Sequence, residues 1–206
     1  MSKKTIWLIV ILVGGYITFQ LTADVAAAKI VEIAGITMPA GTFVFALTFT
    51  WRDILHKKLG RQWARASIIM AAICNVFLAL YFVFAIRLPA AGFWPLQDSF
   101  AATLGIVWRI TLASIAAEVV SQLIDTEIYQ LLAPKTRGPW QFLRVLGSNA
   151  VSLPVDSLIF GFGAFAGTMP IGAILGIAWG QIVFKAIVTL VSLPGIYLVK
   201  EADVQD

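Results

Sequence analysis

The chain has 206 residues, of which 60% are hydrophobic and only 13% are charged, and its formal net charge is +4. Soluble domains average about 25% charged residues, so this composition excludes an ordinary soluble protein and predicts an integral membrane protein. The basic residues lie between apolar runs instead of forming one patch, which argues against direct binding of nucleic acid. One cysteine and one histidine leave no Cys/His metal cluster and no internal disulfide, and we expect neither a metal nor a cofactor.

Six apolar runs are candidates for helices that cross the lipid bilayer, which requires about 20 mostly apolar residues. In chain order they cover residues 5–21, 36–51, 67–86, a run that begins near residue 100 and continues past 121, then 146–166 and 171–199. The second run is short and rich in threonine and glycine, and the sixth is long enough to tilt. We therefore expect an all-α, polytopic membrane protein with six transmembrane helices in one bundle, forming a single transporter domain over residues 1–206.

Lysine and arginine concentrate in alternate loops. The second and fourth loops are strongly basic, whereas the loops between them hold only Lys29 and Arg87. Cytoplasmic loops carry such an excess, so this pattern predicts a multi-pass protein of the inner membrane with both termini in the cytoplasm. Lys3, Lys4 and the following apolar run also resemble a secretory signal peptide. We expect a retained helix instead, because the run is long for such a peptide.

Glycines at helical spacing predict close contacts between helices. Gly172, Gly176 and Gly180 recur at every fourth residue of the last expected helix, and Gly163 and Gly167 form a similar pair at the end of the fifth. This spacing lets two backbones approach closely. The contact lies either inside the bundle or between two copies of the chain in a homodimer, and the pattern fits both.

Polar residues at helical spacing interrupt the apolar runs of the fourth and fifth expected helices. Glu118, Gln122 and Asp125 follow each other at i, i+4 and i+7, and Asn149, Ser152 and Asp156 nearly repeat this spacing. A charge at the bilayer centre costs about 2.5–3.5 kcal/mol on insertion scales, so such residues face a cavity, a bundle interior or one another. The predicted substrate-binding residues are Trp108, Glu118, Gln122, Asp125, Arg144, Asn149, Ser152, Asp156 and Phe160.

Asp156 also has a structural interpretation. Pro154 lies two residues earlier and is expected to kink the helix, as happens where a helix lines a cavity. Lys185 is a base within the sixth expected helix, and an Asp156–Lys185 ion pair is therefore an alternative to ligand binding. Asp156 has both roles, ligand binding and ion pairing, if the pair opens when substrate or a proton arrives. We assign Lys185, together with Gln181 four residues before it, to this gating or ion pair.

The chemistry of these residues favours a small, planar and donor-rich ligand. Carboxylates and amides are available for hydrogen bonds, and aromatic side chains such as Trp108 and Phe160 are available for stacking. A carboxylate accepts two parallel N–H bonds, as in bidentate pairing with arginine, and a guanine-like ring edge offers such a pair of donors. These residues indicate a ligand that is polar, planar, donor-rich and small, a class that includes nucleobase-like molecules.

Three stretches of the sequence resemble the queuosine precursor transporter family, which is grouped with vitamin uptake transporters. They are residues 50–53 before a basic loop, residues 113–118 with 121 and 125–129, and residues 144–149 with 156–160. The resemblance implies six transmembrane helices and import of 7-cyano- or 7-aminomethyl-7-deazaguanine, or queuine, for tRNA modification. It also implies a site made of Glu118, Asp125, Arg144, Asn149 and Asp156.

Two other functions compete with a self-sufficient carrier. The first is a substrate-capture membrane subunit of an ATP-driven, vitamin-type importer. The sequence has no P-loop, so its ATPase would be a separate protein. The second is an intramembrane enzyme, but the chain has no nucleophile–base pair and no metal motif to support it. We therefore expect a protein that is not an enzyme.

Overall fold

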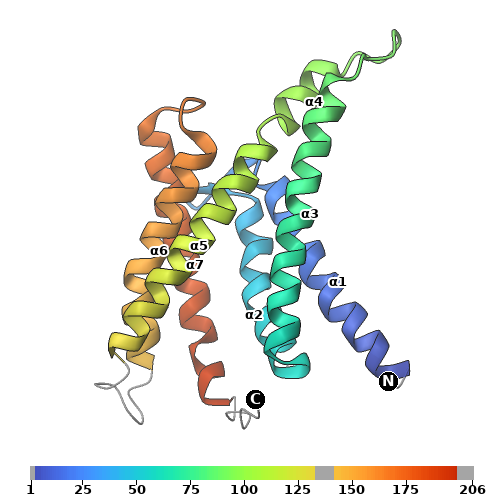
Figure 1. The fold of residues 1–206 in the computed structure, drawn as a ribbon. Coiled ribbons are helices and arrows are strands. Elements are labelled where there is room, and N and C mark those ends of the chain that lie inside the picture. The colour runs from blue at the N-terminus through green and yellow to red at the C-terminus, as the bar shows by residue number, and fades with distance from the viewer. Residues whose placement is uncertain (1–2, 133–141, 199–206) are drawn as a thin grey trace. The chain divides into compact units, whose positions relative to one another are not determined.

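The computed structural model describes residues 3–132 and 142–198, which are almost entirely helical (Figure 1). The elements in chain order are α1 (Lys3–Ala26), β1 (Ile30–Ile33), β2 (Ile36–Pro39), α2 (Gly41–Leu59), α3 (Arg61–Arg87), α4 (Gln97–Leu104), α5 (Val107–Leu132), α6 (Phe142–Phe165) and α7 (Ile171–Leu198). The predicted all-α class is thus confirmed, apart from one short hairpin.

Four helical segments in the described residues are long and apolar enough to cross a membrane: Lys3–Ala26, Gln62–Arg87, Gln97–Asp125 and Ile171–Val191. Large apolar side chains such as Phe77 and Leu80 on α3 are exposed, as expected for a surface in contact with lipid. Polar residues interrupt α6, where Asn149 and Asp156 lower the hydropathy. The chain is a multi-pass membrane protein, and six spans with cytoplasmic termini remain a prediction.

Residues 30–39 correct the prediction that a helix begins at residue 36. Ile30–Ile33 and Ile36–Pro39 pair as antiparallel strands, with Ile33 opposite Ile36. Ala34 and Gly35 form the two-residue turn with φ values of 53° and 77°, the positive angles that tight hairpin turns require. Isoleucine and threonine favour the extended backbone on either side. Helix α2 therefore begins only at Gly41.

The fourth expected helix corresponds to the candidate span Gln97–Asp125, which is divided into two helices by a short turn. α4 ends at Leu104 and α5 begins at Val107, after Gly105, whose amide donates to the Ala101 carbonyl oxygen as the helix closes. Glycine is a poor residue for a helix interior, and Gly105 is the last residue here to make a helical hydrogen bond before the turn. The short α4 has no buried residue.

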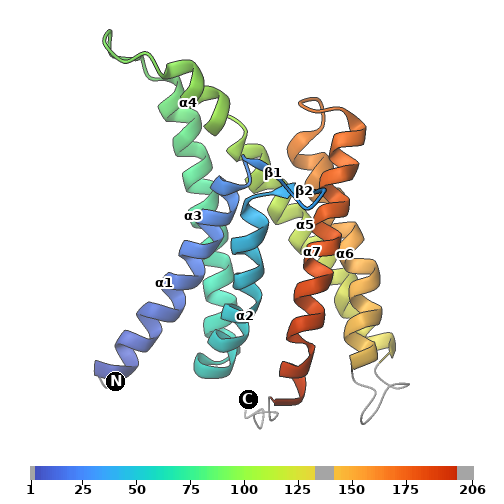
Figure 2. The ribbon, with the colours of Figure 1, turned by 180° about the vertical axis from the view of Figure 1, so that it is seen from behind.

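The chain divides into two compact units, residues 1–112 and 113–206, with the boundary inside α5. In the first unit α1 packs on α2 and α3 around Leu12, Tyr16 and Leu55. The Trp51 Nε1 of α2 donates to the Leu12 carbonyl oxygen at 2.8 Å, and only a glycine fits at position 15 beside the Trp51 ring. Figure 2 shows the hairpin joining the end of α1 to the start of α2.

The second unit contains the rest of α5 with α6 and α7. Glycines of α6 make its close contacts: a Cβ on Gly163 would lie 2.8 Å from the Ala113 Cβ of α5, and one on Gly161 would lie 3.3 Å from Ile174 of α7. Gly167 is not a packing residue but has a φ of 78° in the turn after α6, which corrects the predicted Gly163–Gly167 pair. Within the described residues, Gly172 and Gly176 have nothing within 4 Å of a Cβ position. The predicted homodimer stays a prediction.

Candidate substrate site

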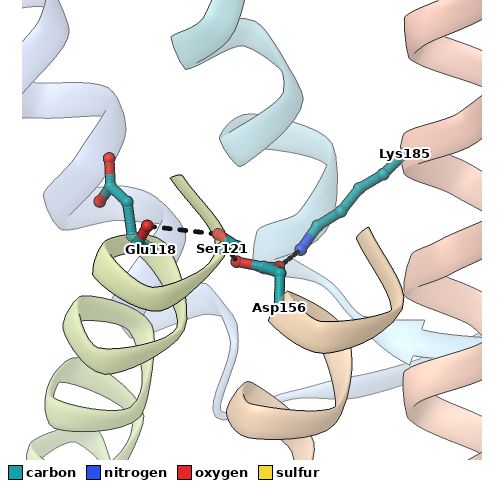
Figure 3. A network of polar contacts seen from close by, with 4 residues as sticks. All are labelled: Glu118, Ser121, Asp156 and Lys185. Atoms are coloured by element: carbon teal, nitrogen blue, oxygen red, sulfur yellow. Dashed lines mark hydrogen bonds and ion pairs between the residues drawn. The ribbon is translucent and has the colours of Figure 1, made fainter. Parts of the chain in front are cut away.

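Asp156 of α6 and Lys185 of α7 form an ion pair inside the second unit (Figure 3). The Lys185 ammonium donates to the Oδ2 of Asp156, and the side chains of Lys185 and Asp156 are only 7% and 13% exposed. The predicted alternative of an Asp156–Lys185 pair is therefore present. A buried charge persists where an opposite charge and further hydrogen bonds compensate the loss of water.

Ser121 of α5 brings a third helix to Asp156. Its Oγ lies 3.3 Å from the Asp156 Oδ1 and 3.2 Å from the Glu118 carbonyl oxygen. A hydroxyl has one proton, so Ser121 donates to only one of these two acceptors at a time. It can thus release the carboxylate without losing its own hydrogen bond.

Helices α5 and α6 make a second serine–aspartate contact, in which α6 provides the serine and α5 the aspartate. Ser152 of α6 donates to the Oδ1 of Asp125 on α5 at 3.2 Å. Ser121 and Asp125 are one turn apart on α5, and Ser152 and Asp156 are one turn apart on α6, so the antiparallel helices pair serine with aspartate twice. We call Ser121, Asp125, Ser152 and Asp156 the Ser–Asp ladder.

A weaker contact joins α6 to α7 away from the ion pair. The Asn149 Nδ2 lies 3.4 Å from the Thr189 Oγ1, near the limit for a hydrogen bond. Ser148, next to Asn149, is fully buried. Polar contacts on α6 therefore run from Asn149 through Ser152 to Asp156, along one face of the helix.

Comparison of the sequence with known proteins identifies a family. The family described as "Putative vitamin uptake transporter" matches residues 39–199. The chain belongs to this family. It is also 30% identical over 184 residues to a "Probable queuosine precursor transporter" of Bacillus subtilis (strain 168), covering 87% of this chain and 79% of that protein. No solved structure matches. The resemblance in the sequence is confirmed, and the chain is a membrane transporter with a small-molecule substrate.

The structure places four of the nine predicted binding residues in contact with other polar side chains. Asp125, Ser152 and Asp156 belong to the Ser–Asp ladder, and Asn149 bonds to Thr189. The side chains of Gln122 and Arg144 lie outside the described part of the structure.

Three further predicted residues occupy other positions. The Glu118 carboxylate points away from Asp156, while its backbone carbonyl accepts from Ser121 (Figure 3). Phe160 is buried and packs edge-to-face on Phe165, with ring centroids 6.0 Å apart. Trp108 belongs to the first unit and is 43% exposed, as a lipid-facing tryptophan would be. Their roles in binding remain predictions.

A second buried carboxylate was missed in the sequence. Asp24 is 6% exposed near the end of α1, and the Thr111 Oγ1 of α5 donates to its Oδ2 at 3.1 Å within the first unit. The predicted first helix ended at residue 21, but α1 continues to Ala26. Tyr16, Gln20 and Asp24 are spaced at i, i+4 and i+8, and all are buried, so the polar spacing was the available signal. The Gln20 Nε2 donates to the Tyr16 hydroxyl at 3.0 Å.

Metal chemistry has no support in the described residues. No group of three or more His, Cys, Asp or Glu side chains there could hold a metal ion. The site is a set of hydrogen-bonding groups and one ion pair, which suits reversible binding of a polar molecule.

Proposed function

We propose that this protein imports 7-deazaguanine precursors of queuosine across the inner membrane for use in tRNA modification. The name of the Bacillus subtilis relative supplies the substrate class. The observation that carries the proposal in this chain is the Ser–Asp ladder with its buried Asp156–Lys185 pair. Polar groups within apolar helices are costly, and a transported polar ligand is a reason to retain them.

The carboxylate of Asp156 matches the edge of a guanine-like ring. Such a ring presents an N–H next to an exocyclic amine, and a carboxylate accepts two parallel N–H bonds. Lys185 and Ser121 each use one acceptor position of Asp156, whereas an ionised carboxylate has about four. The substrate can therefore donate hydrogen bonds to Asp156 while Lys185 and Ser121 still compensate the charge of the carboxylate.

The contacts around Asp156 also allow it to change partners. Ser121 can turn its single proton to the Glu118 carbonyl oxygen, and Lys185 has a long flexible side chain that can withdraw. Binding of substrate would replace these contacts, and its release would restore them. If the ion pair opens during the transport cycle, ligand binding is coupled to the separation of α6 from α7.

Cells that cannot synthesise queuosine precursors provide the test. We expect cells with the chain to regain queuosine in tRNA when fed a 7-deazaguanine precursor at low concentration, and cells without it to remain deficient. Feeding each precursor in turn identifies the preferred one. Absence of queuosine despite full-length protein in the membrane would reject the proposal, provided that a known transporter restores it in the same strain.

A further inference from the structure

Two buried polar groups beside the ion pair have no hydrogen-bond partner among the described residues. They are the Nε2 of Gln181 on α7 and the Oγ of Ser157 on α6. Gln181 is 3% exposed and Ser157 is 0% exposed, so neither reaches the surface. Buried polar groups are nearly always paired, and an exception in an apolar setting indicates a missing partner.

Both groups lie close to the candidate substrate site. Ser157 follows Asp156 directly on α6, and Gln181 is one turn before Lys185 on α7. Residues one turn apart on a helix share a face, about 6 Å apart along the axis. The Gln181 amide therefore lies on the face of α7 from which Lys185 reaches Asp156.

The packing of α6 on α7 shows where the two helices come closest. Gly161 lies one turn after Ser157, and a Cβ there would lie 3.8 Å from the Ala178 Cβ, so the helices are close at that level. In the other direction the helices are joined by the long Lys185 side chain. The Lys185 side is therefore the one from which a planar ring would reach Gln181.

We propose that Gln181 is a specificity-determining residue, whose Nε2 donates a hydrogen bond to the ring carbonyl oxygen of the substrate, with the Ser157 hydroxyl beside it. This inference rests on the proposed function. In a 7-deazaguanine the carbonyl carbon is bonded to the ring nitrogen whose N–H would donate a hydrogen bond to Asp156. One carboxylate and one amide donor thus read adjacent atoms of the same ring edge. The substrate carbonyl supplies the acceptor that the Gln181 amide lacks.

The test compares Gln181→Met with Gln20→Met. Methionine keeps the length of glutamine and removes its polar atoms. Gln20 is the matched control because it is also buried but already donates to Tyr16. Two properties are measured for each purified variant: thermal stability without substrate, and competition for uptake by the 6-thio analogue of 7-deazaguanine. Sulfur accepts hydrogen bonds weakly, while the N–H and the amine of the ring edge are kept.

We expect wild-type protein and Gln20→Met to prefer the oxo over the 6-thio compound by roughly tenfold, since a site with a buried donor rejects a ligand that leaves it unpaired. Gln181→Met should lose this preference. It should also be as stable as wild type or more so, because a donor without a partner is removed. Gln20→Met should be less stable, as it breaks an existing bond. Ser157→Ala should leave stability unchanged and reduce the preference in part.

Three results would overturn the inference. If Gln181→Met is destabilised as much as Gln20→Met, then Gln181 has a structural partner, such as a bound water. If the wild type transports the precursor and Gln181→Met keeps the preference for the oxo compound, Gln181 does not contact the carbonyl, while the proposed function stands. If the wild type transports no precursor at all, the proposed function fails and the inference with it.

Discussion

Lys185 on α7 and Asp156 on α6 compensate each other's charge at a place in the second unit where both side chains are largely buried. Burial of either charge therefore depends on the presence of the other. Removing one partner of a buried pair leaves an uncompensated charge and costs about 3–5 kcal/mol. A loss of transport after one substitution would not by itself distinguish a binding residue from a structural one, which determines the design of the first test.

Single and double substitutions of the ion pair separate these two roles. We expect Asp156→Asn and Lys185→Met each to lower thermal stability and abolish uptake. The charge-reversed double variant, Asp156→Lys with Lys185→Asp, should regain much of the stability because the pair is re-formed. It should still fail to transport, since the carboxylate now extends from α7. Transport by the reversed variant would make the pair purely structural.

The Ser–Asp ladder predicts that substitution of either of its two serines reduces uptake. Ser121→Ala and Ser152→Ala each remove one hydrogen bond to an aspartate, worth about 0.6 kcal/mol on average between membrane helices. We expect small losses of stability but clear losses of uptake, measured in membranes with equal amounts of protein. Ser67→Ala is the control, because the Ser67 hydroxyl donates to the Trp63 carbonyl oxygen within α3. Equal losses for all three variants would argue against a role of the ladder in transport.

Two glycines should respond differently to alanine. A Cβ on Gly163 would lie 2.8 Å from the Ala113 Cβ, so Gly163→Ala should separate α5 from α6 and cost about 1–3 kcal/mol, as overpacking does. Gly172→Ala meets nothing within 4 Å in the described residues and should leave thermal stability unchanged. Melting of the purified variants in detergent measures both. A stability loss for Gly172→Ala in the detergent-dispersed protein would instead reveal a contact with a second copy.

The orientation in the membrane can be measured directly. Reporter fusions after Gly92, in the loop between α3 and α4, and after Asp206 should report opposite sides of the membrane. The basic loops predict that Asp206 is cytoplasmic and Gly92 is not. Reporter activity on the same side for both positions would contradict the predicted topology.

Long apolar runs made much of the fold predictable. α1, α3 and α7 lie close to the predicted ranges because continuous hydrophobicity over about 20 residues is typical of a membrane-spanning helix and rare elsewhere. The hairpin was missed because two strands of four residues give only a weak pattern, and their turn uses Ala34, a residue type seldom found at a positive φ. The break at Gly105 was missed because glycine is frequent in membrane helices.

Several residues of the candidate site and its Asp156–Lys185 pair were predictable, but the two serine–aspartate pairs were not. Helical spacing identified Asp125, Ser152 and Asp156, since polar residues in apolar runs are rare. Which serine bonds to which aspartate depends on the register between α5 and α6, which close packing at Gly163 sets and local sequence does not encode. Ser121 was passed over for the same reason, because a serine is compatible with any face of a helix.

Uptake by the purified chain in liposomes tests the central claim most directly. The protein, reconstituted alone, should carry labelled 7-deazaguanine precursor into the vesicles, with or without an imposed pH gradient, and the charge-reversed Asp156→Lys, Lys185→Asp variant should not. Greater accumulation with the gradient would indicate proton coupling, and equal uptake would indicate facilitated transport. The account is contradicted if correctly inserted wild-type protein carries no precursor, or carries it only after a separate ATPase complex is added.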